Sequence, residues 1–174
     1  GHGARAMLLK GLAEVGTAQP TADELQSHLA VFLDHYRENI AITSRPFPGA
    51  LAAIEALRSD GAEIAICTNK REAWARALID ALSLNQYFGA IVGADSTQAA
   101  KPDPRPVHRC LELTGVRRGV FVGDSDTDIR AAQAARLPCL AALFGYGPLD
   151  LCDEAFGLFS TYDEAPALVR WAAA

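Results

Sequence analysis

The chain changes from strand to helix within residues 120–132, and this change limits the folds open to it. Residues 120–122 are two valines around a phenylalanine, which is typical of a buried strand, and Gly123 interrupts the run. From Thr127 onward the composition is typical of a helix. The segment therefore predicts a strand, a turn and a helix in succession, the unit from which parallel α/β sheets are built.

Two acidic residues flank this turn. Asp124 follows the strand, and Asp128 lies in the first helical turn, where side chains tilt back toward the helix N-terminus. We therefore expect both carboxylates to face one point in the crevice beyond the strand ends. Two converging oxygen ligands suit Mg²⁺. The alternative is that the two residues only cap the helix and favour its positive end.

The chain after residue 50 alternates regularly between helices and strands. Further strands are expected at residues 64–67, 90–92, 139–143 and 156–159, and helices at residues 51–57, 73–82, 107–113 and 163–171. This order predicts right-handed crossovers and the α/β class, with a Rossmann-like, mostly parallel sheet and helices on both faces.

The first part of the chain has a different pattern. Residues 3–15, and the residues that follow a capping box of Thr21 and Glu24, show helical spacing with no strand between them. They predict a helical hairpin. Two prolines and a glycine then fall within residues 45–49, where we place a hinge. We therefore divide the chain into a helical part, residues 1–45, and an α/β core, residues 46–174.

The parallel topology predicts a site by itself, because parallel strands end at one edge of the sheet. Thr68 and Asn69, Lys101 and the two acidic residues all follow strands and should meet at that edge. A hydroxyl, an amide, an ammonium and two carboxylates suit a phosphate group held by a divalent cation. Taken singly, Thr68 and Asn69 are equally well explained as turn formers, and Lys101 as a solvated loop charge.

Composition narrows the choice of partners and compartment. The chain has 174 residues, half of them hydrophobic, and a formal net charge of −5 without a basic cluster, which argues against a nucleic-acid partner. No apolar run reaches the length of a membrane span and no signal peptide is recognisable, so we expect no membrane partner and a cytoplasmic protein. The four cysteines have apolar neighbours and no Cys-x-x-Cys spacing, so we expect them to be small buried side chains.

Three motifs, in order, resemble those of the haloacid dehalogenase-like hydrolases, which are mainly Mg²⁺-dependent phosphatases. They are Ile-Ala-Ile-Cys-Thr-Asn-Lys at residues 64–70, Lys-Pro-Asp-Pro at residues 101–104, and residues 122–128. The Thr-Asn-Lys and Lys-Pro-Asp-Pro segments and Phe-Gly-Tyr-Gly at residues 144–147 are similar to the phosphoglycolate phosphatase group. The resemblance implies hydrolysis of a small phosphorylated carboxylic acid, with 2-phosphoglycolate favoured.

The resemblance also implies roles for individual residues. Thr68 and Asn69 would bind the phosphoryl group, and Lys101 would neutralise charge on the phosphate and on the nucleophile. Asp124 would ligate Mg²⁺, and Asp128 would support the metal directly or through water.

The helical part would, by the same resemblance, be a partial mobile cap with its hinge at residues 46–49. Residues 1–5 look like a cap loop over the substrate. Arg5 would then contact a carboxylate of the substrate.

The sequence departs from the family pattern at the nucleophile. In the family this is the first aspartate of an Asp-x-Asp motif on the first strand, ahead of the cap, and the chain as given starts inside the cap. The Asp-x-Asp candidates lie only between Asp124 and Asp128. Without the nucleophile an aspartyl-phosphate cannot form, so we expect the chain as given to be inactive and the intact protein to be the enzyme.

The missing strand would be the central one, between the strands that end at Thr68 and Asp124. The edges left open invite pairing with another chain. Three outcomes are open: the two strands pair with each other, a neighbouring molecule supplies a strand by dimerisation or strand exchange, or an N-terminal segment exists outside this sequence. Two other functions are also open, a non-catalytic phosphate-binding module and a phosphatase for sugar phosphates or nucleotides.

Overall fold

The computed structural model of the protein describes residues 3–16 and 19–174. The chain divides into two compact units, with the boundary between Ser44 and Arg45. Every helix in the described ranges is too short or too polar to pass through a lipid bilayer.

The first unit is a helical hairpin, as its pattern predicts. Helix α1 (Gly3–Glu14) packs against helix α2 (Ala22–Glu38). The capping box at the start of α2 is complete: the Thr21 N–H donates to Glu24 Oε2 at 2.9 Å, and the Glu24 N–H donates to Thr21 Oγ1 at 3.4 Å. These bonds satisfy two N–H groups that have no partner within the helix, and they fix where α2 begins.

The start of this unit differs from the prediction of a cap loop at residues 1–5. Helix α1 already begins at Gly3, and Arg5 lies on it with an exposed side chain. Residues 4–9 are mostly alanine, leucine and methionine, which are strong helix formers and account for the early start. Gly1 and His2 lie outside the described residues.

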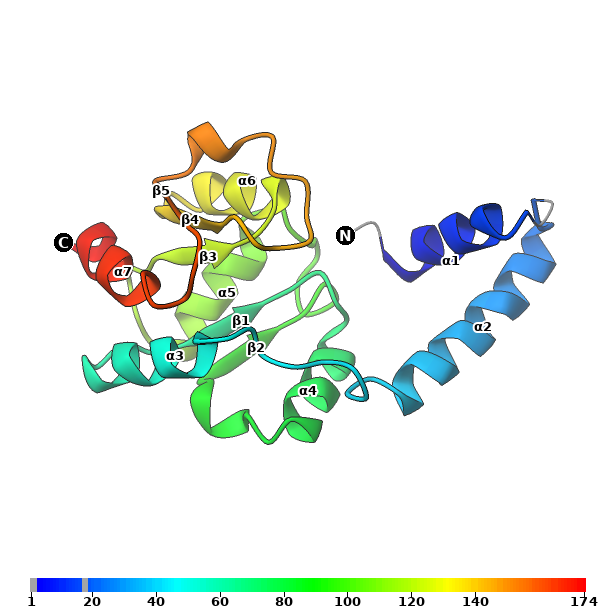
Figure 1. The fold of residues 1–174 in the computed structure, drawn as a ribbon, viewed down its shortest axis with the longest axis horizontal. Coiled ribbons are helices and arrows are strands. Elements are labelled where there is room, and N and C mark those ends of the chain that lie inside the picture. The colour runs from blue at the N-terminus through cyan, green and yellow to red at the C-terminus, as the bar shows by residue number, and fades with distance from the viewer. Residues whose placement is uncertain (1–2, 17–18) are drawn as a thin grey trace. The chain divides into compact units, whose positions relative to one another are not determined.

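The second unit has the predicted alternation of strands and helices (Figure 1). Its elements are α3 (Ala50–Ser59), β1 (Ala65–Cys67), α4 (Glu72–Ala81), η1 (Asn85–Tyr87), β2 (Ala90–Val92), α5 (Arg105–Thr114), β3 (Phe121–Gly123), α6 (Asp126–Ala134), β4 (Cys139–Ala142), η2 (Cys152–Glu154), β5 (Gly157–Phe159) and α7 (Ala165–Ala173). The predicted strands and helices are present with small differences at their ends, which confirms the α/β class.

All strand pairs of this unit are parallel, as predicted, but they form two sheets instead of one. One sheet is β1–β2, with Ile66 opposite Ile91, and the other has the order β3–β4–β5. In the described part of the chain, no ladder joins β1 to β3. The structure therefore excludes the outcome in which these two strands pair with each other, and the other two outcomes stay predictions.

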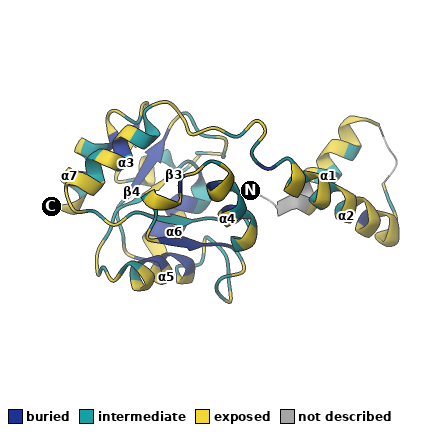
Figure 2. Ribbon diagram, turned by 90° about the horizontal axis from the view of Figure 1, so that it is seen from below, coloured by how far each residue is buried: buried dark blue, intermediate teal, exposed yellow. Residues whose placement is uncertain are grey.

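Helices cover both faces of the strands, because the side chains of a strand alternate between its faces. Cys139 and Ala141 of β4 pack against α6, whereas Leu140 and Ala142 pack toward α7. Buried residues, dark blue in Figure 2, lie on the strands and on the helix faces turned toward them.

The two sheets share the wall of one cavity of about 630 Å³. Both β1 and β3 line it, together with α3, α5 and α7. Most of the lining is apolar, with Ile64, Val107, Phe121 and Val169 among the contributing side chains. The unpaired strand edges therefore lie beside an apolar space.

The cysteines match the prediction only in part. Cys110 and Cys139 are buried as predicted, but Cys67 and Cys152 are only half-buried. Cys67 lies on β1, whose edge lines the cavity, and Cys152 lies in the short turn η2, so neither is covered on all sides.

Candidate functional site

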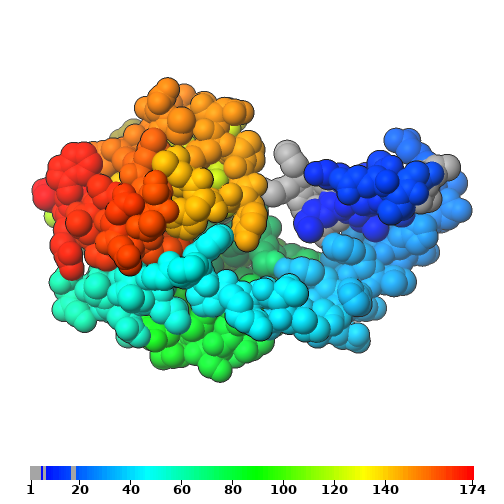
Figure 3. Space-filling model, viewed as in Figure 1, coloured from blue at the N-terminus to red at the C-terminus, as the bar shows by residue number. Residues whose placement is uncertain are grey.

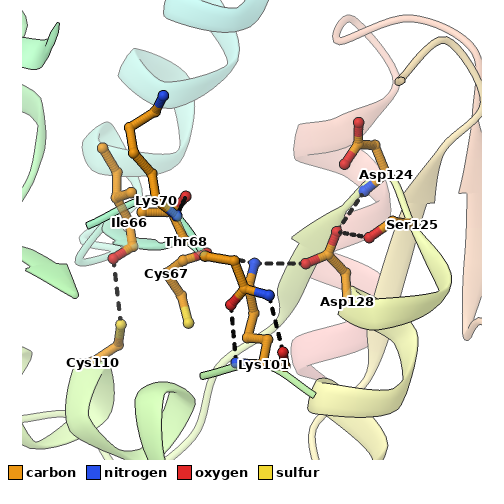
Figure 4. A network of polar contacts seen from close by, with 10 residues as sticks. Ile66, Cys67, Thr68, Lys70, Lys101, Cys110, Asp124, Ser125 and Asp128 are labelled. Atoms are coloured by element: carbon orange, nitrogen blue, oxygen red, sulfur yellow. Dashed lines mark hydrogen bonds and ion pairs between the residues drawn. The ribbon is translucent and has the colours of Figure 1, made fainter. Parts of the chain in front are cut away.

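The side chain of Lys101 joins the two sheets of the second unit. Its ammonium donates a 2.7 Å hydrogen bond to the carbonyl oxygen of Cys67, at the end of β1, and forms a 2.7 Å ion pair with Asp128 Oδ1 in the first turn of α6 (Figure 4). Only 10% of the Lys101 side chain and 8% of the Asp128 side chain are exposed. The loop after β2 therefore meets the ends of β1 and β3 at one buried ammonium.

Asn69 holds the backbone of Lys101 in place. Its Nδ2 donates to the Lys101 carbonyl oxygen at 2.9 Å, and its Oδ1 accepts from the Lys101 N–H at 3.0 Å. The following peptide bond, Lys101–Pro102, is cis. Because both polar atoms of the Asn69 amide bond to this loop, the geometry favours a positioning role, and its predicted contact with a phosphoryl group stays a prediction.

Asp128 accepts hydrogen bonds at both carboxylate oxygens. Besides Lys101 at Oδ1, the Ser125 hydroxyl donates to Oδ2 at 2.7 Å and the Asp124 N–H donates to Oδ2 at 3.1 Å. Burial alone would raise the pKa of Asp128, but the charge of Lys101 and these hydrogen bonds outweigh it, so the pKa lies below its usual value. A Cβ at Gly123 would lie 2.3 Å from the Asp128 Cβ, which explains why the turn requires glycine there.

Asp124 has a different partner. Its Oδ2 accepts a 2.9 Å hydrogen bond from the Tyr146 N–H, in the loop after β4. In Figure 4 its carboxylate lies apart from the Lys101–Asp128 pair. The spacing of the two aspartates predicts that their carboxylates face one point, but in the structure they do not. Asp128 is turned toward Lys101 and Ser125, while Asp124 bonds to the loop after β4.

The carboxylate of Asp124 fits Mg²⁺ better than that of Asp128 does. The described residues include no group of three His, Cys, Asp or Glu side chains that could hold a metal ion. Mg²⁺ keeps several waters, however, and is commonly held by one or two protein carboxylates. Within the described residues Asp124 Oδ1 accepts no hydrogen bond, whereas both oxygens of Asp128 do. Because both oxygens of Asp128 are engaged, its predicted support of a metal would have to pass through water, and this role stays a prediction.

Thr68 lies at the same edge, directly after β1. Its N–H donates to the Val92 carbonyl oxygen at 2.9 Å, and its Oγ1 accepts from the Lys70 N–H at 3.1 Å. The hydroxyl still has its own proton to donate. This hydroxyl proton is the group that could bind an anionic oxygen, and the predicted phosphate contact of Thr68 stays a prediction. Arg5 belongs to the first unit, and its contact with a substrate stays a prediction.

Several groups at the site escaped the sequence-based prediction. The carbonyl oxygen of Cys67 and the N–H of Tyr146 are backbone groups, for which the residue type gives no signal. Ser125 had a signal: it precedes the predicted helix, at the N-cap position where serine is preferred. In the structure its hydroxyl donates to Asp128 instead of capping the backbone.

The chain matches the haloacid dehalogenase-like hydrolase family over residues 4–136. It is 44% identical over 151 residues to a phosphoglycolate phosphatase of Mesorhizobium japonicum, covering 84% of this chain and 65% of that protein. It is 40% identical over 148 residues to a phosphoglycolate phosphatase of Caulobacter vibrioides, covering 84% of this chain and 62% of that protein. The chain thus spans just under two thirds of the length of these relatives.

A crystal structure described as a predicted phosphoglycolate phosphatase from Haemophilus somnus is similar in fold, with a TM-score of 0.84. The match covers 95% of this chain and 75% of the other, at 24% sequence identity. This similarity agrees with the Rossmann-like α/β architecture of the second unit.

Proposed function

Because the chain belongs to the haloacid dehalogenase-like hydrolases, we propose that it carries the phosphate-binding site of a Mg²⁺-dependent phosphatase whose substrate is 2-phosphoglycolate. The observation that carries the proposal is the buried ammonium of Lys101, held between the end of β1 and Asp128. The names of the two phosphoglycolate phosphatase relatives support the substrate.

Lys101 would neutralise negative charge on the phosphoryl group. A lysine ammonium has three N–H donors, and Cys67 and Asp128 accept two of them, which leaves one for a phosphate oxygen. Phosphoryl transfer depends mostly on positioning and on charge stabilisation. An ammonium that is fixed and shielded from water stabilises charge more strongly than a solvated one, and Asn69 fixes the backbone that carries it.

The other residues complete the binding of the phosphoryl group. Thr68 would donate its hydroxyl to a second phosphate oxygen. Asp124 would hold Mg²⁺ through Oδ1, and the bound ion would neutralise further charge on the phosphate. Asp128 would keep Lys101 in position, because its low pKa keeps it ionised at neutral pH.

The covalent step would be in-line attack by an aspartate, which gives an aspartyl-phosphate that water then hydrolyses. Such a nucleophile needs a carboxylate oxygen that is free and close to Lys101. Asp128 accepts hydrogen bonds at both oxygens, and the Asp124 carboxylate lies apart from Lys101, with its Oδ2 bonded to the Tyr146 N–H (Figure 4). We therefore propose that the 174-residue chain by itself binds phosphate without turnover, and that the nucleophile belongs to the intact protein.

The test combines binding and turnover in the purified 174-residue chain. Isothermal titration with 2-phosphoglycolate in the presence of Mg²⁺ should show binding, and an assay for released inorganic phosphate should show no turnover. Phosphate release would contradict the proposed inactivity, and a lack of binding would contradict the site itself. Tighter binding of a sugar phosphate or a nucleotide than of 2-phosphoglycolate would overturn the proposed substrate.

A further inference from the structure

Five aromatic side chains pack together next to Asp124, and we call them the aromatic cluster. They are Phe47, Phe144, Tyr146, Phe159 and Tyr162. The ring centroid of Phe47 lies 5.2 Å from that of Phe144, 5.8 Å from that of Tyr146 and 6.5 Å from that of Tyr162. Phe47 comes from the segment at the start of the second unit, so it connects this segment to the loop after β4. In Figure 3 the cyan atoms of this segment lie against the orange atoms of the C-terminal part.

The loop after β4, residues 143–147, contributes Phe144 and Tyr146 to the aromatic cluster and contacts Asp124. The Tyr146 N–H bonds to Asp124 Oδ2, and a Cβ at Gly145 would lie 2.1 Å from the Asp124 Cβ. A Cβ at Gly147 would lie 2.4 Å from the Ser125 Cβ. Only glycine permits such close contacts, so the backbone of this loop lies directly against residues 124 and 125.

The Phe47 ring packs against both aromatic residues of the loop after β4, Phe144 and Tyr146. Tyr146 is 90% exposed, and its ring centroid lies 5.8 Å from that of Phe47. Phe47 is itself 37% exposed. Gly49, two residues on, has φ +78° and would place a Cβ 3.1 Å from Asp163 Oδ1. The backbone next to Phe47 is therefore packed closely against Asp163, in the same unit as the loop that the Phe47 ring contacts.

We propose that Phe47 is a positioning residue for Asp124. Its ring holds the loop after β4 where the Tyr146 N–H fixes the Asp124 carboxylate. Any effect of Phe47 on Mg²⁺ binding rests on the proposed function. Its effect on the hydrogen bond between the Tyr146 N–H and Asp124 does not. Because Phe47 and Gly49 are both packed within the second unit, the predicted hinge would be confined to residues before Phe47. Any motion there that withdraws the Phe47 ring would release the carboxylate.

The test compares Phe47→Ala with Phe156→Ala in the full 174-residue chain. Phe156 is the matched control, because it is similarly exposed, at 45%, and its ring contacts Trp171 instead of the aromatic cluster. Amide hydrogen exchange at Tyr146, measured by NMR, should be about tenfold faster in Phe47→Ala, which is the effect of losing aromatic contacts of this kind. In Phe156→Ala it should equal the wild-type rate.

Exchange at Tyr146 that stays within about twofold of wild type in folded Phe47→Ala would overturn the proposal. If Phe47→Ala does not fold, exchange at Tyr146 is measured in Phe47→Leu, which keeps an apolar side chain, and the same twofold limit applies.

A Mg²⁺ titration of the Asp124 amide signal separates this proposal from the proposed function. No Mg²⁺ binding by wild type would refute the metal site alone, and unchanged Tyr146 exchange would refute the positioning role alone. If wild type binds Mg²⁺, Phe47→Ala should bind it several-fold more weakly.

Discussion

The ammonium of Lys101 and the carboxylate of Asp128 form a 2.7 Å ion pair that links the loop after β2 to the first turn of α6. No strand ladder of the described residues joins the two sheets on either side of this pair. A buried ion pair with this position should contribute to the stability of the second unit as well as to its chemistry. Both consequences can be measured.

Asp128→Asn should destabilise the second unit by about 3–5 kcal/mol, because it leaves the buried Lys101 ammonium without its counter-charge. Urea unfolding followed by circular dichroism measures the change. Glu112→Gln on α5 is the control, since it removes a carboxylate that is 65% exposed from an ion pair with Arg109. Its cost should stay below about 1 kcal/mol. Equal effects of the two variants would contradict the role given to Asp128.

The depressed pKa of Asp128 predicts a specific response to acid. The unfolded state takes up the Asp128 proton near its ordinary pKa of about 3.9, and the folded state takes it up only at lower pH. The stability from this group is therefore fully present above the ordinary pKa and is lost as pH falls through the folded pKa. Between about pH 5 and pH 3 the free energy of unfolding should fall more steeply for wild type than for Asp128→Asn. Parallel pH profiles would show that Asp128 is not the source.

Gly145→Ala should disturb Asp124, because the new Cβ would lie 2.1 Å from the Asp124 Cβ. We expect a loss of about 1–3 kcal/mol in the free energy of unfolding, as for other overpacked sites. Gly119→Ala is the matched control, since its Cβ would meet only Leu111 Cδ2, at 3.4 Å, and its effect should stay near zero. A stable Gly145→Ala protein with an unchanged Tyr146 amide signal would contradict the tight contact.

Asn69→Ala should loosen the loop that carries Lys101, because it removes both hydrogen bonds to the Lys101 backbone. The expected cost is about 1–3 kcal/mol, together with faster hydrogen exchange at the Lys101 amide. Asn85→Ala serves for comparison, since Asn85 bonds to the exposed Asp80 side chain outside the site. If Lys101 exchange were the same in both variants, Asn69 would have no positioning role.

The elements and the convergence of their loops could be predicted, because both follow from local pattern and from parallel topology. Apolar runs such as residues 139–143 identify buried strands, and strands with helical crossovers end at a common edge. That is why Thr68, Lys101 and Asp124 could be assigned to one edge from the sequence.

The orientation of each side chain at that edge could not be predicted, because it depends on contacts between distant segments. Asp128 turns toward Lys101, 27 residues earlier in the chain, and Asp124 accepts from Tyr146, 22 residues later. The spacing of the two aspartates carries no information about these partners. The separation into two sheets likewise depends on which strand edges pair, and the strand sequences alone do not determine this.

The central claim is that Lys101 is the charge centre of a phosphate site. Its most direct test is the affinity for inorganic phosphate, measured by isothermal titration with Mg²⁺ present, for wild type, Lys101→Met and Lys10→Met. Lys10 is the control because its side chain is 80% exposed on α1. We predict more than about tenfold weaker binding for Lys101→Met, the effect of losing a charged hydrogen bond, and no change for Lys10→Met. Wild-type affinity in folded Lys101→Met would contradict the account.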